Sequence, residues 1–255
     1  MNAIFLCAGF ATRMYPLTRN FPKPLLEVAG RPVLDYLLDQ VVELDGLETI
    51  HVVTNARFVE HFETWQAGHQ ARLAEKSLSL QLYNDGSTEN DNRLGAVGDL
   101  GVVIASQASW GPTLVVAGDN IFRFDLKPHW NHFLRSGQHH VVALEELSQE
   151  KLRRTGVLEL DSDDRVLAFH EKPDVPPSSW ACPPIYFLGE SALQRVPEYL
   201  AQPDAGDAPG NFVRFLSDHE PVHAFRVRGE RLDIGSQASF AAADELLRRE
   251  PVIVG

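Results

Sequence analysis

Short apolar runs alternate with longer segments of helical hydrophobic period through the first half of the chain. The short runs predict strands, and the longer segments predict helices with one apolar face. Strands that alternate with helices favour right-handed crossovers and a mostly parallel sheet. The predicted elements are strand 3–8, helix 32–44, strand 48–54, helix 57–75, strand 78–83, helix 95–107 and strand 113–118.

The pattern changes after Val141, where strands follow one another with tight turns between them. The tetrad DSDD stands between two alternating runs and predicts a hairpin, and the prolines of 173–184 predict a loop. The remaining predicted elements are strand 185–188, helices 190–200 and 210–217, strands 222–227 and 230–234, and helix 237–249. We therefore expect an α/β protein with a Rossmann-like three-layer fold and a mixed, mostly parallel central sheet.

Two sets of side chains look like ligand sites but have a simpler structural explanation. Phe58, Phe62 and Trp65 form a stripe at helical spacing, which is typical of core packing. The ten histidines include pairs on a predicted helix and strand, but no third ligand recurs at metal spacing. We interpret both sets as structural or surface groups.

Composition places the chain among globular proteins, with 44% hydrophobic and 23% charged residues in 255. Cys7 and Cys182 form no disulfide or metal pattern, which favours a reducing compartment. No apolar run is long enough to span a bilayer, and no basic segment precedes the first strand, so we expect a cytoplasmic protein without a membrane partner. The net charge of −12 argues against nucleic acid as a partner.

The first predicted strand runs into a turn of small residues, LCAGFATR. Gly9 and Ala11 leave the backbone accessible, and Thr12 adds a hydroxyl, so the turn predicts an anion-binding nest for phosphates. Pro16 and Pro22 block a helix directly after the turn. This feature separates the turn from the glycine-rich loops of dinucleotide-binding and ATP-binding folds, and it argues against an NAD-dependent oxidoreductase.

The same segment is positively charged, although the whole chain is negatively charged. Arg13, Arg19, Lys23 and Arg31 lie between Gly9 and Arg31 against the single acid Glu27, a local balance of +3. An acidic protein needs such a patch to attract an anionic substrate. We expect Arg13 and Lys23 to converge on the phosphates of a nucleotide.

Two aspartates follow strand-like segments from opposite halves of the chain. Asp119 ends the apolar run TLVVAGD, and Asp233 lies in ERLDIG. Each carboxylate could cap a following helix. Together they could instead hold one or two Mg²⁺ ions through oxygen ligands.

Four ordered elements resemble the sugar-1-phosphate nucleotidyltransferases, the glucose-1-phosphate thymidylyltransferases among them. These elements are GFATR with its downstream PK, GDN, FHEKP and LDIG, and the resemblance extends from Met1 to about Leu247. Ala11 departs from the glycine that members of the family carry in this turn. A methyl group fits there only if the φ angle of Ala11 is negative.

The resemblance implies one nucleotidyltransferase domain over 1–255 of GT-A-like type, with a nucleotide-binding half 1–140 and a sugar-phosphate-binding half 141–255. It implies catalytic roles for Arg13 and Lys23 and a metal site at Asp119 and Asp233. In the family's FxEKP element the lysine holds the acceptor phosphate and the glutamate contacts the sugar. The further residues it implies are Ala8, Gly9, Ala11, Thr12, Asn84, Gly95 and Ala96 for the nucleotide, and Gly156, Glu171 and Lys172 for the sugar phosphate.

The implied reaction is Mg²⁺-dependent transfer of a nucleotidyl group from an NTP, with UTP or dTTP favoured, to a sugar 1-phosphate. The resemblance leaves the oligomeric state open, and a homo-oligomer is compatible with it. Two alternatives remain. One is a cytidylyltransferase for a non-sugar phosphate such as phosphocholine, with Trp180, Tyr186 and Glu190 as parts of an amine cage. The other is a catalytically silent paralogue that binds sugar nucleotides.

Overall fold

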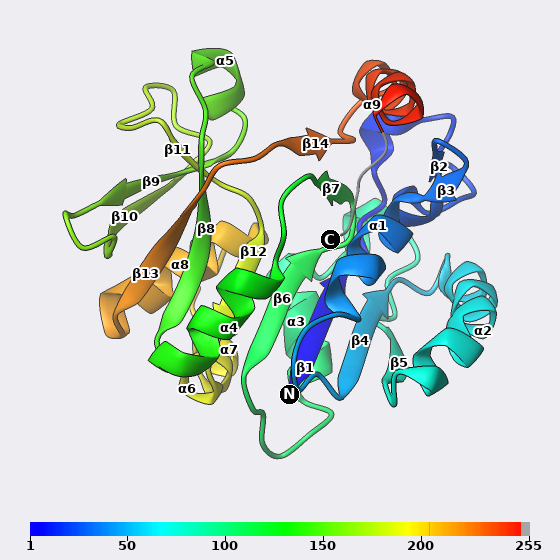
Figure 1. Ribbon diagram of the computed structural model, residues 1–255, viewed down its shortest axis with the longest axis horizontal. Helices are drawn as coiled ribbons and strands as arrows, with labels where there is room; N and C mark the ends of the chain where they lie inside the picture. Colours follow the sequence, from blue (N-terminus) through cyan, green and yellow to red (C-terminus); the bar gives the residue numbers. More distant parts are fainter. Residues whose placement is uncertain (204, 251–255) are drawn as a thin grey trace.

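The computed structural model describes residues 1–203 and 205–250, which form three layers around one continuous sheet (Figure 1). The sheet has ten strands: β1 (Asn2–Leu6), β4 (Thr49–Thr54), β5 (Ser79–Asn84), β6 (Thr113–Ala117), β8 (His139–Glu145), β9 (Gly156–Leu160), β10 (Val166–Glu171), β11 (Trp180–Cys182), β12 (Ile185–Leu188) and β13 (Val222–Val227). Their order is β10-β9-β11-β8-β12-β6-β1-β4-β5, and β13 pairs with β8.

Most strands of this sheet run in the same direction. β1 pairs in parallel with β4 and β6, β4 with β5, and β8 with β13. β12 runs antiparallel between β6 and β8, and β11 and β10 also oppose the main direction. The predicted α/β class and the mixed, mostly parallel central sheet are confirmed.

The strands carry apolar side chains on both faces of the sheet, and helices cover both faces. In β1, Phe5 packs into one core cluster, while Ile4 and Leu6 pack into the cluster on the opposite face. The first face is covered by α1 (Val33–Val41), α2 (Val59–Glu75) and α4 (Lys127–Ser136). The second face is covered by α3 (Ala96–Ile104), α6 (Glu190–Gln194), α7 (Val196–Leu200) and α8 (Pro209–His219).

The remaining elements lie beyond the carboxyl ends of the parallel strands or beside them (Figure 1). Two short antiparallel pairs are present, β2 (Glu27–Val28) with β3 (Arg31–Pro32), and β7 (Asn120–Phe122) with β14 (Arg231–Asp233). The helical pieces are the 3₁₀ turns η1 (Thr12–Met14), η2 (Lys23–Leu25) and η3 (Asn90–Asn92), with α5 (Gln149–Leu152) and α9 (Gln237–Arg249).

The aromatic stripe of α2 is core, as predicted. Phe58, Phe62 and Trp65 are all buried in the cluster beneath this helix. The sequence pattern missed β7 and α5, and it merged α6 and α7 into one helix. Pro197 explains that error, since it stands at the start of α7, where proline cannot continue the preceding helix. The loop predicted over 173–184 is wrong in part, because Trp180–Cys182 form β11.

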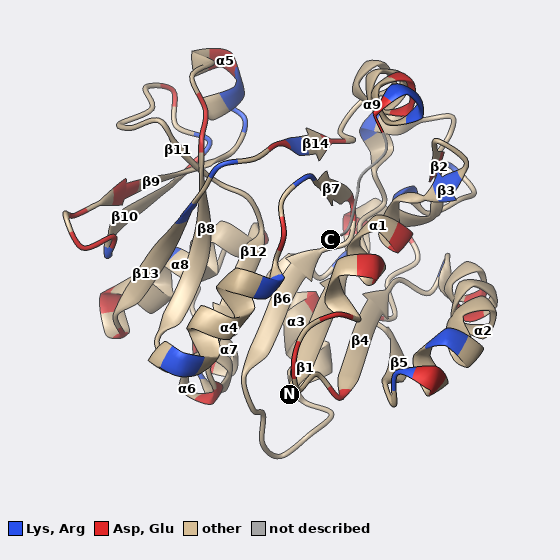
Figure 2. Cartoon of the chain, viewed as in Figure 1, with Lys and Arg blue, Asp and Glu red and all other residues tan. Residues whose placement is uncertain are grey.

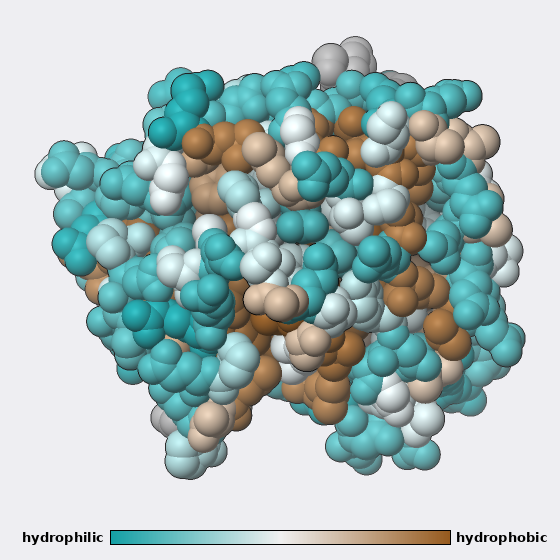
Figure 3. All heavy atoms as spheres, turned by 90° about the horizontal axis from the view of Figure 1, so that it is seen from below, coloured by the Kyte–Doolittle hydropathy of each residue, from teal (hydrophilic) through white to brown (hydrophobic). Residues whose placement is uncertain are grey.

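The lower face of the molecule lies at the opposite end of the sheet from the carboxyl ends of the parallel strands. Figure 3 shows this face largely covered by hydrophilic residues, with hydrophobic residues visible between them in several separate patches. Among the described residues, no helix combines the length and the apolar character that crossing a lipid bilayer requires.

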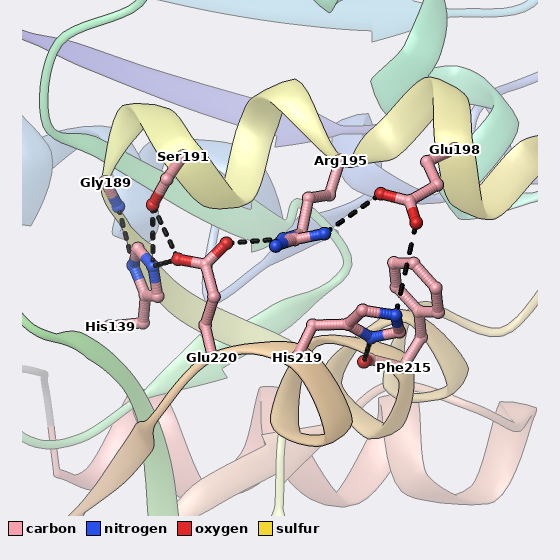
Figure 4. Close-up of polar contacts among 8 residues, drawn as sticks. All are labelled: His139, Gly189, Ser191, Arg195, Glu198, Phe215, His219 and Glu220. Carbon is pink, nitrogen blue, oxygen red and sulfur yellow. Dashed lines mark hydrogen bonds and ion pairs between the residues drawn. The ribbon is translucent and has the colours of Figure 1, made fainter.

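A network of charged side chains ties β8 to α6 and α8 at this lower end (Figure 4). Glu220 accepts hydrogen bonds from Ser191 Oγ at 2.7 Å, His139 Nε2 at 2.9 Å and the Arg195 guanidinium. Nδ1 of His139 accepts from the backbone of Gly189 at 3.0 Å, so its Nε2 carries the proton toward Glu220. Ser191 also donates its proton to Glu220, so it is not activated by His139 as a nucleophile would be. This Ser–His–Glu set therefore stabilises the fold and is not a nucleophilic triad.

Replacing Glu220 with glutamine should lower the free energy of unfolding at neutral pH by about 1–2 kcal/mol. Burial alone would raise the pKa of Glu220, but the bonds from Ser191, Arg195 and His139 outweigh it and lower that pKa to about 2. The stabilisation is therefore present above the ordinary glutamate pKa and is lost as the pH falls toward 2. Urea unfolding of both proteins across this range measures the effect.

Glu198→Gln is the matched control, because Glu198 also pairs with Arg195 but its side chain is 52% exposed. It should change stability little. Equal losses in the two variants would contradict the assignment of the buried network as the stabilising element.

Candidate functional site

A cleft of about 540 Å³ opens at the carboxyl ends of β1 and β6, where residues from both halves of the chain meet. This is the edge at which ligands bind in open α/β sheets. Most of the predicted site residues line it: Ala8, Gly9, Ala11, Thr12, Arg13, Lys23, Gly95, Ala96, Asp119, Glu171, Lys172 and Asp233. Asn84 and Gly156 are not among the lining residues.

The turn after β1 corrects the expectation for Ala11. Its φ angle is +46°, in the left-handed region, and not negative as the methyl group required. This conformation costs about 1–2 kcal/mol for a non-glycine residue. The carbonyl of Ala11 accepts hydrogen bonds from Thr18 Oγ1 at 2.8 Å and from the Met14 amide at 2.9 Å, which hold the turn in place. The strain therefore lies in the wall of the cleft.

Lys23 and Asp119 form an ion pair of 2.9 Å across 96 residues of sequence. The Lys23 side chain is only 7% exposed, so its charge faces the cleft floor and not bulk water. Burial would raise the pKa of Asp119, but the Lys23 ammonium and, more weakly, Arg231 lower it below its ordinary value. Asp119 is therefore a carboxylate at neutral pH.

Neither predicted aspartate caps a helix. Asp119 leads directly into β7, and the N-cap of α9 is Ser236, which accepts from the amide of Ser239. The β7–β14 pairing sets Asp233 opposite Asn120, the neighbour of Asp119 in the chain. The two carboxylates thus approach from opposite halves of the chain, as the metal hypothesis requires.

Asp119, Asp233 and Asn120 suit a hard cation that takes its remaining ligands from water and from the substrate. No cluster of three or more His, Cys, Asp or Glu suited to a metal occurs in residues 1–203 and 205–250. Asp119 and Asp233 supply carboxylate oxygens, and the buried Oδ1 of Asn120 has no hydrogen-bond partner in the same described part. Mg²⁺ suits such a site, because it retains waters and takes substrate phosphate oxygens as ligands.

Successive residues of a strand usually point to opposite faces, but the side chains of Glu171 and Lys172 meet each other. Their side chains form an ion pair of 2.9 Å at the end of β10. Lys172 leaves the strand with a φ angle of +46°, which breaks the alternation, and its amide donates to the Thr155 carbonyl. Both residues line the cleft, and the Lys172 side chain is 54% exposed there.

Gly156 and Asn84 have structural explanations outside the cleft. A Cβ atom on Gly156 would lie 2.2 Å from the Phe169 ring, so packing requires glycine there. The Asn84 side chain accepts from the amide of Gly86 at 2.8 Å in a local turn. Gly95 and Ala96 do line the cleft at the start of α3, where the Asp207 carbonyl accepts from the Ala96 amide.

The sequence reasoning missed Arg231 and Asp99, which also line the cleft. Arg231 could have been found from strand alternation, because it stands two residues before Asp233 and shares its face of β14. Asp99 lies on α3 and is 6% exposed, and nothing in its spacing distinguishes it from a surface helix residue.

The prediction that Trp180, Tyr186 and Glu190 form parts of an amine cage is wrong. The Tyr186 side chain is buried, the Trp180 ring lies 4.8 Å from the Arg226 guanidinium, and the Glu190 carboxylate accepts from the Trp110 amide. None of the three lines the cleft. A quaternary amine therefore finds no aromatic cage from these residues.

Comparisons of sequence and of fold find several similar proteins. The chain is 24% identical over 248 residues to the bifunctional protein GlmU of Methanocaldococcus jannaschii, covering 97% of this chain but 54% of that protein. It is 25% identical to the UTP–glucose-1-phosphate uridylyltransferase AglF of Haloferax volcanii, covering 98% of each. The fold is similar to that of a UDP-glucose pyrophosphorylase complexed with UDP-glucose, with a TM-score of 0.82, 18% identity and 98% of each chain covered.

The chain spans about half the length of its GlmU relative but nearly the whole of AglF. The family model described as nucleotidyl transferase matches residues 2–250, almost the entire chain. The chain belongs to the nucleotidyl transferase family.

Proposed function

We propose that this protein transfers a nucleotidyl group from an NTP to a sugar 1-phosphate and releases pyrophosphate. The observation that carries the proposal is the cleft itself, which gathers the Lys23–Asp119 pair from one half and the Glu171–Lys172 pair from the other. Two substrates that must react with each other need one cleft lined in this way. Both substrates are anions, which accounts for the arginines and lysines in an otherwise acidic protein.

In this reaction a phosphate oxygen of the acceptor attacks the α-phosphorus of the NTP. The new P–O bond forms as the bond from the α-phosphorus to the bridging oxygen breaks, and that oxygen leaves with pyrophosphate. The attacking oxygen is already anionic, so no residue has to remove a proton. Arg13 and Lys23 bind the triphosphate and screen its charge, Lys172 binds the acceptor phosphate, and Glu171 contacts the sugar.

The small residues of the cleft accommodate the nucleotide in this proposal. The backbone of Ala8, Gly9, Ala11 and Thr12 approaches the phosphates, and Gly95 with Ala96 leaves space for the base. Asp119 and Asp233 would hold Mg²⁺, which when bound neutralises phosphate charge and orients the triphosphate. The nucleotide half is 1–140, and the acceptor half is 141–255.

For the substrates we favour UTP, with dTTP second, and a hexose 1-phosphate such as glucose 1-phosphate. The full-length similarity to AglF supports this choice, since that relative is named for UTP and glucose 1-phosphate. The test is a matrix of the common NTPs against a panel of sugar 1-phosphates, with phosphocholine included, scored by Mg²⁺-dependent pyrophosphate release. Release with one NTP and one sugar 1-phosphate identifies the substrates.

A matrix without release anywhere would overturn the proposal. Calorimetry that shows NTP binding in the absence of any release would then support the silent paralogue. Release with phosphocholine alone would support the cytidylyltransferase.

Lys172→Ala should raise the KM for the sugar 1-phosphate by about tenfold or more and leave the KM for the NTP nearly unchanged. The reason is that Lys172 is an exposed cation on the acceptor side of the cleft, and its ion-pair partner Glu171 belongs to the same site. Initial rates with each substrate varied in turn measure both constants. Lys151→Ala is the control, because Lys151 is 74% exposed and lies outside the cleft. A selective rise in the KM for the NTP would assign Lys172 to the other substrate.

A further inference from the structure

Arg231 differs from most other cations that line the cleft because its charge is not paired. Lys23, Arg93, Arg154 and Lys172 each form an ion pair with a carboxylate. In the described part of the chain, the Arg231 side chain makes no ion pair and no hydrogen bond, although it is half-buried. Its N–H groups are therefore available to a ligand in the cleft.

The strand β14 directs this side chain into the cleft. Arg231 pairs with Phe122 of β7, and Leu232 packs against the core cluster beneath the ribbon. Successive residues of a strand point to opposite faces, so Arg231 shares the cleft face with Asp233. The positive residues of this segment are visible where β14 crosses between the two halves (Figure 2).

Arg231 lines the cleft together with residues from both halves of the chain. Lys23 and Asp119 belong to the nucleotide half, and Glu171 and Lys172 belong to the acceptor half. The guanidinium therefore lies in the one cleft that both substrates of the proposed reaction would share.

We infer that Arg231 is a catalytic residue that contacts both reacting phosphates, the α-phosphate of the NTP and the phosphate of the acceptor. The inference rests on the proposed function. A planar guanidinium donates several N–H groups in a fixed fork, which suits two phosphates held side by side. It reduces the repulsion between the two anions as they approach, and it binds the pentavalent arrangement more strongly than either substrate alone.

Arg231→Gln tests the inference through the separate kinetic constants. We expect kcat to fall about 100-fold or more, with each KM changed less than about threefold. Arg231→Lys keeps the charge without the fork and should recover only part of the loss. Arg228→Gln is the matched control, because Arg228 is exposed in the same segment and does not line the cleft. Its kcat should equal that of the parent.

Calorimetry supplies a readout independent of turnover. The NDP-sugar product contains both phosphates, so Arg231→Gln should weaken its binding about tenfold, and binding of the sugar 1-phosphate alone should change far less. A kcat within twofold of the parent, full recovery in Arg231→Lys, or an effect confined to one KM would overturn the inference. A parent protein without activity in the substrate matrix would instead overturn the proposed function, so the two failures are distinguishable.

Discussion

Asp119→Asn should lower kcat for pyrophosphate release by about 100-fold or more and leave the fold intact. Asp119 is ionised, contacts Lys23 at 2.9 Å and lies next to the β7–β14 ribbon that brings in Asp233. Asparagine keeps the size and one oxygen but removes the negative charge. The proposed metal then loses one of its two charged protein ligands.

The substitution also leaves the Lys23 ammonium without its carboxylate, so the two causes must be separated. Titration of activity with Mg²⁺ does so, because loss of a metal ligand shifts the half-saturating Mg²⁺ concentration upward. Loss of the lysine contact alone lowers kcat at every concentration. The unfolding midpoint in urea checks the fold, and Asp218→Asn, an exposed aspartate of α8 outside the cleft, is the control. Turnover near that of the parent would remove Asp119 from the metal site.

The sequence predicted the parts of the fold that depend on local pattern. The strand at β1 is a short apolar run and the helix at α1 has a strong hydrophobic period, and both formed close to where they were expected. The pairing of β7 with β14 was harder to predict, because each strand has three residues and more than 100 residues of sequence separate them. Such a pairing depends on tertiary contacts, which a local pattern does not contain.

The same distinction applies to the cleft. The acidic and basic residues that end strands were predictable, because parallel strands bring their carboxyl ends to one edge. The conformations of Ala11 and Lys172 were not, since both take positive φ angles that their residue types disfavour. Their backbone is held by contacts with Thr18 and Thr155, which only the folded chain provides. Both strained residues line the cleft, where such strain is commonly found.

Asp99→Asn should make the protein more stable at alkaline pH, by an amount on the order of 2 kcal/mol. Asp99 is 6% exposed, and its Oδ1 has no hydrogen-bond partner in the described part of the chain. Burial and the nearby Asp85 carboxylate raise the pKa of Asp99 from 3.8 to about 8. A charged carboxylate at this position is therefore strongly disfavoured in the folded state.

The direction of the pH effect follows from proton binding. The unfolded chain releases the Asp99 proton near the ordinary aspartate pKa, whereas the folded chain keeps it until about pH 8. The folded state thus binds more protons between these values, and the free energy of unfolding falls as the pH rises through them. Asparagine is neutral at every pH, so in the variant this residue no longer makes the free energy of unfolding fall as the pH rises. Urea unfolding of parent and variant at about pH 5 and about pH 8 measures it.

The control is Asp91→Asn, an exposed aspartate of η3, whose stability should follow that of the parent at both pH values. If the Asp99→Asn and parent curves run parallel with pH, Asp99 titrates normally and its burial is not costly. If they diverge as expected, the chain keeps an unfavourable acid in the wall of its cleft, where asparagine would be more stable. In that case we expect Asp99 to contact a bound substrate in the cleft.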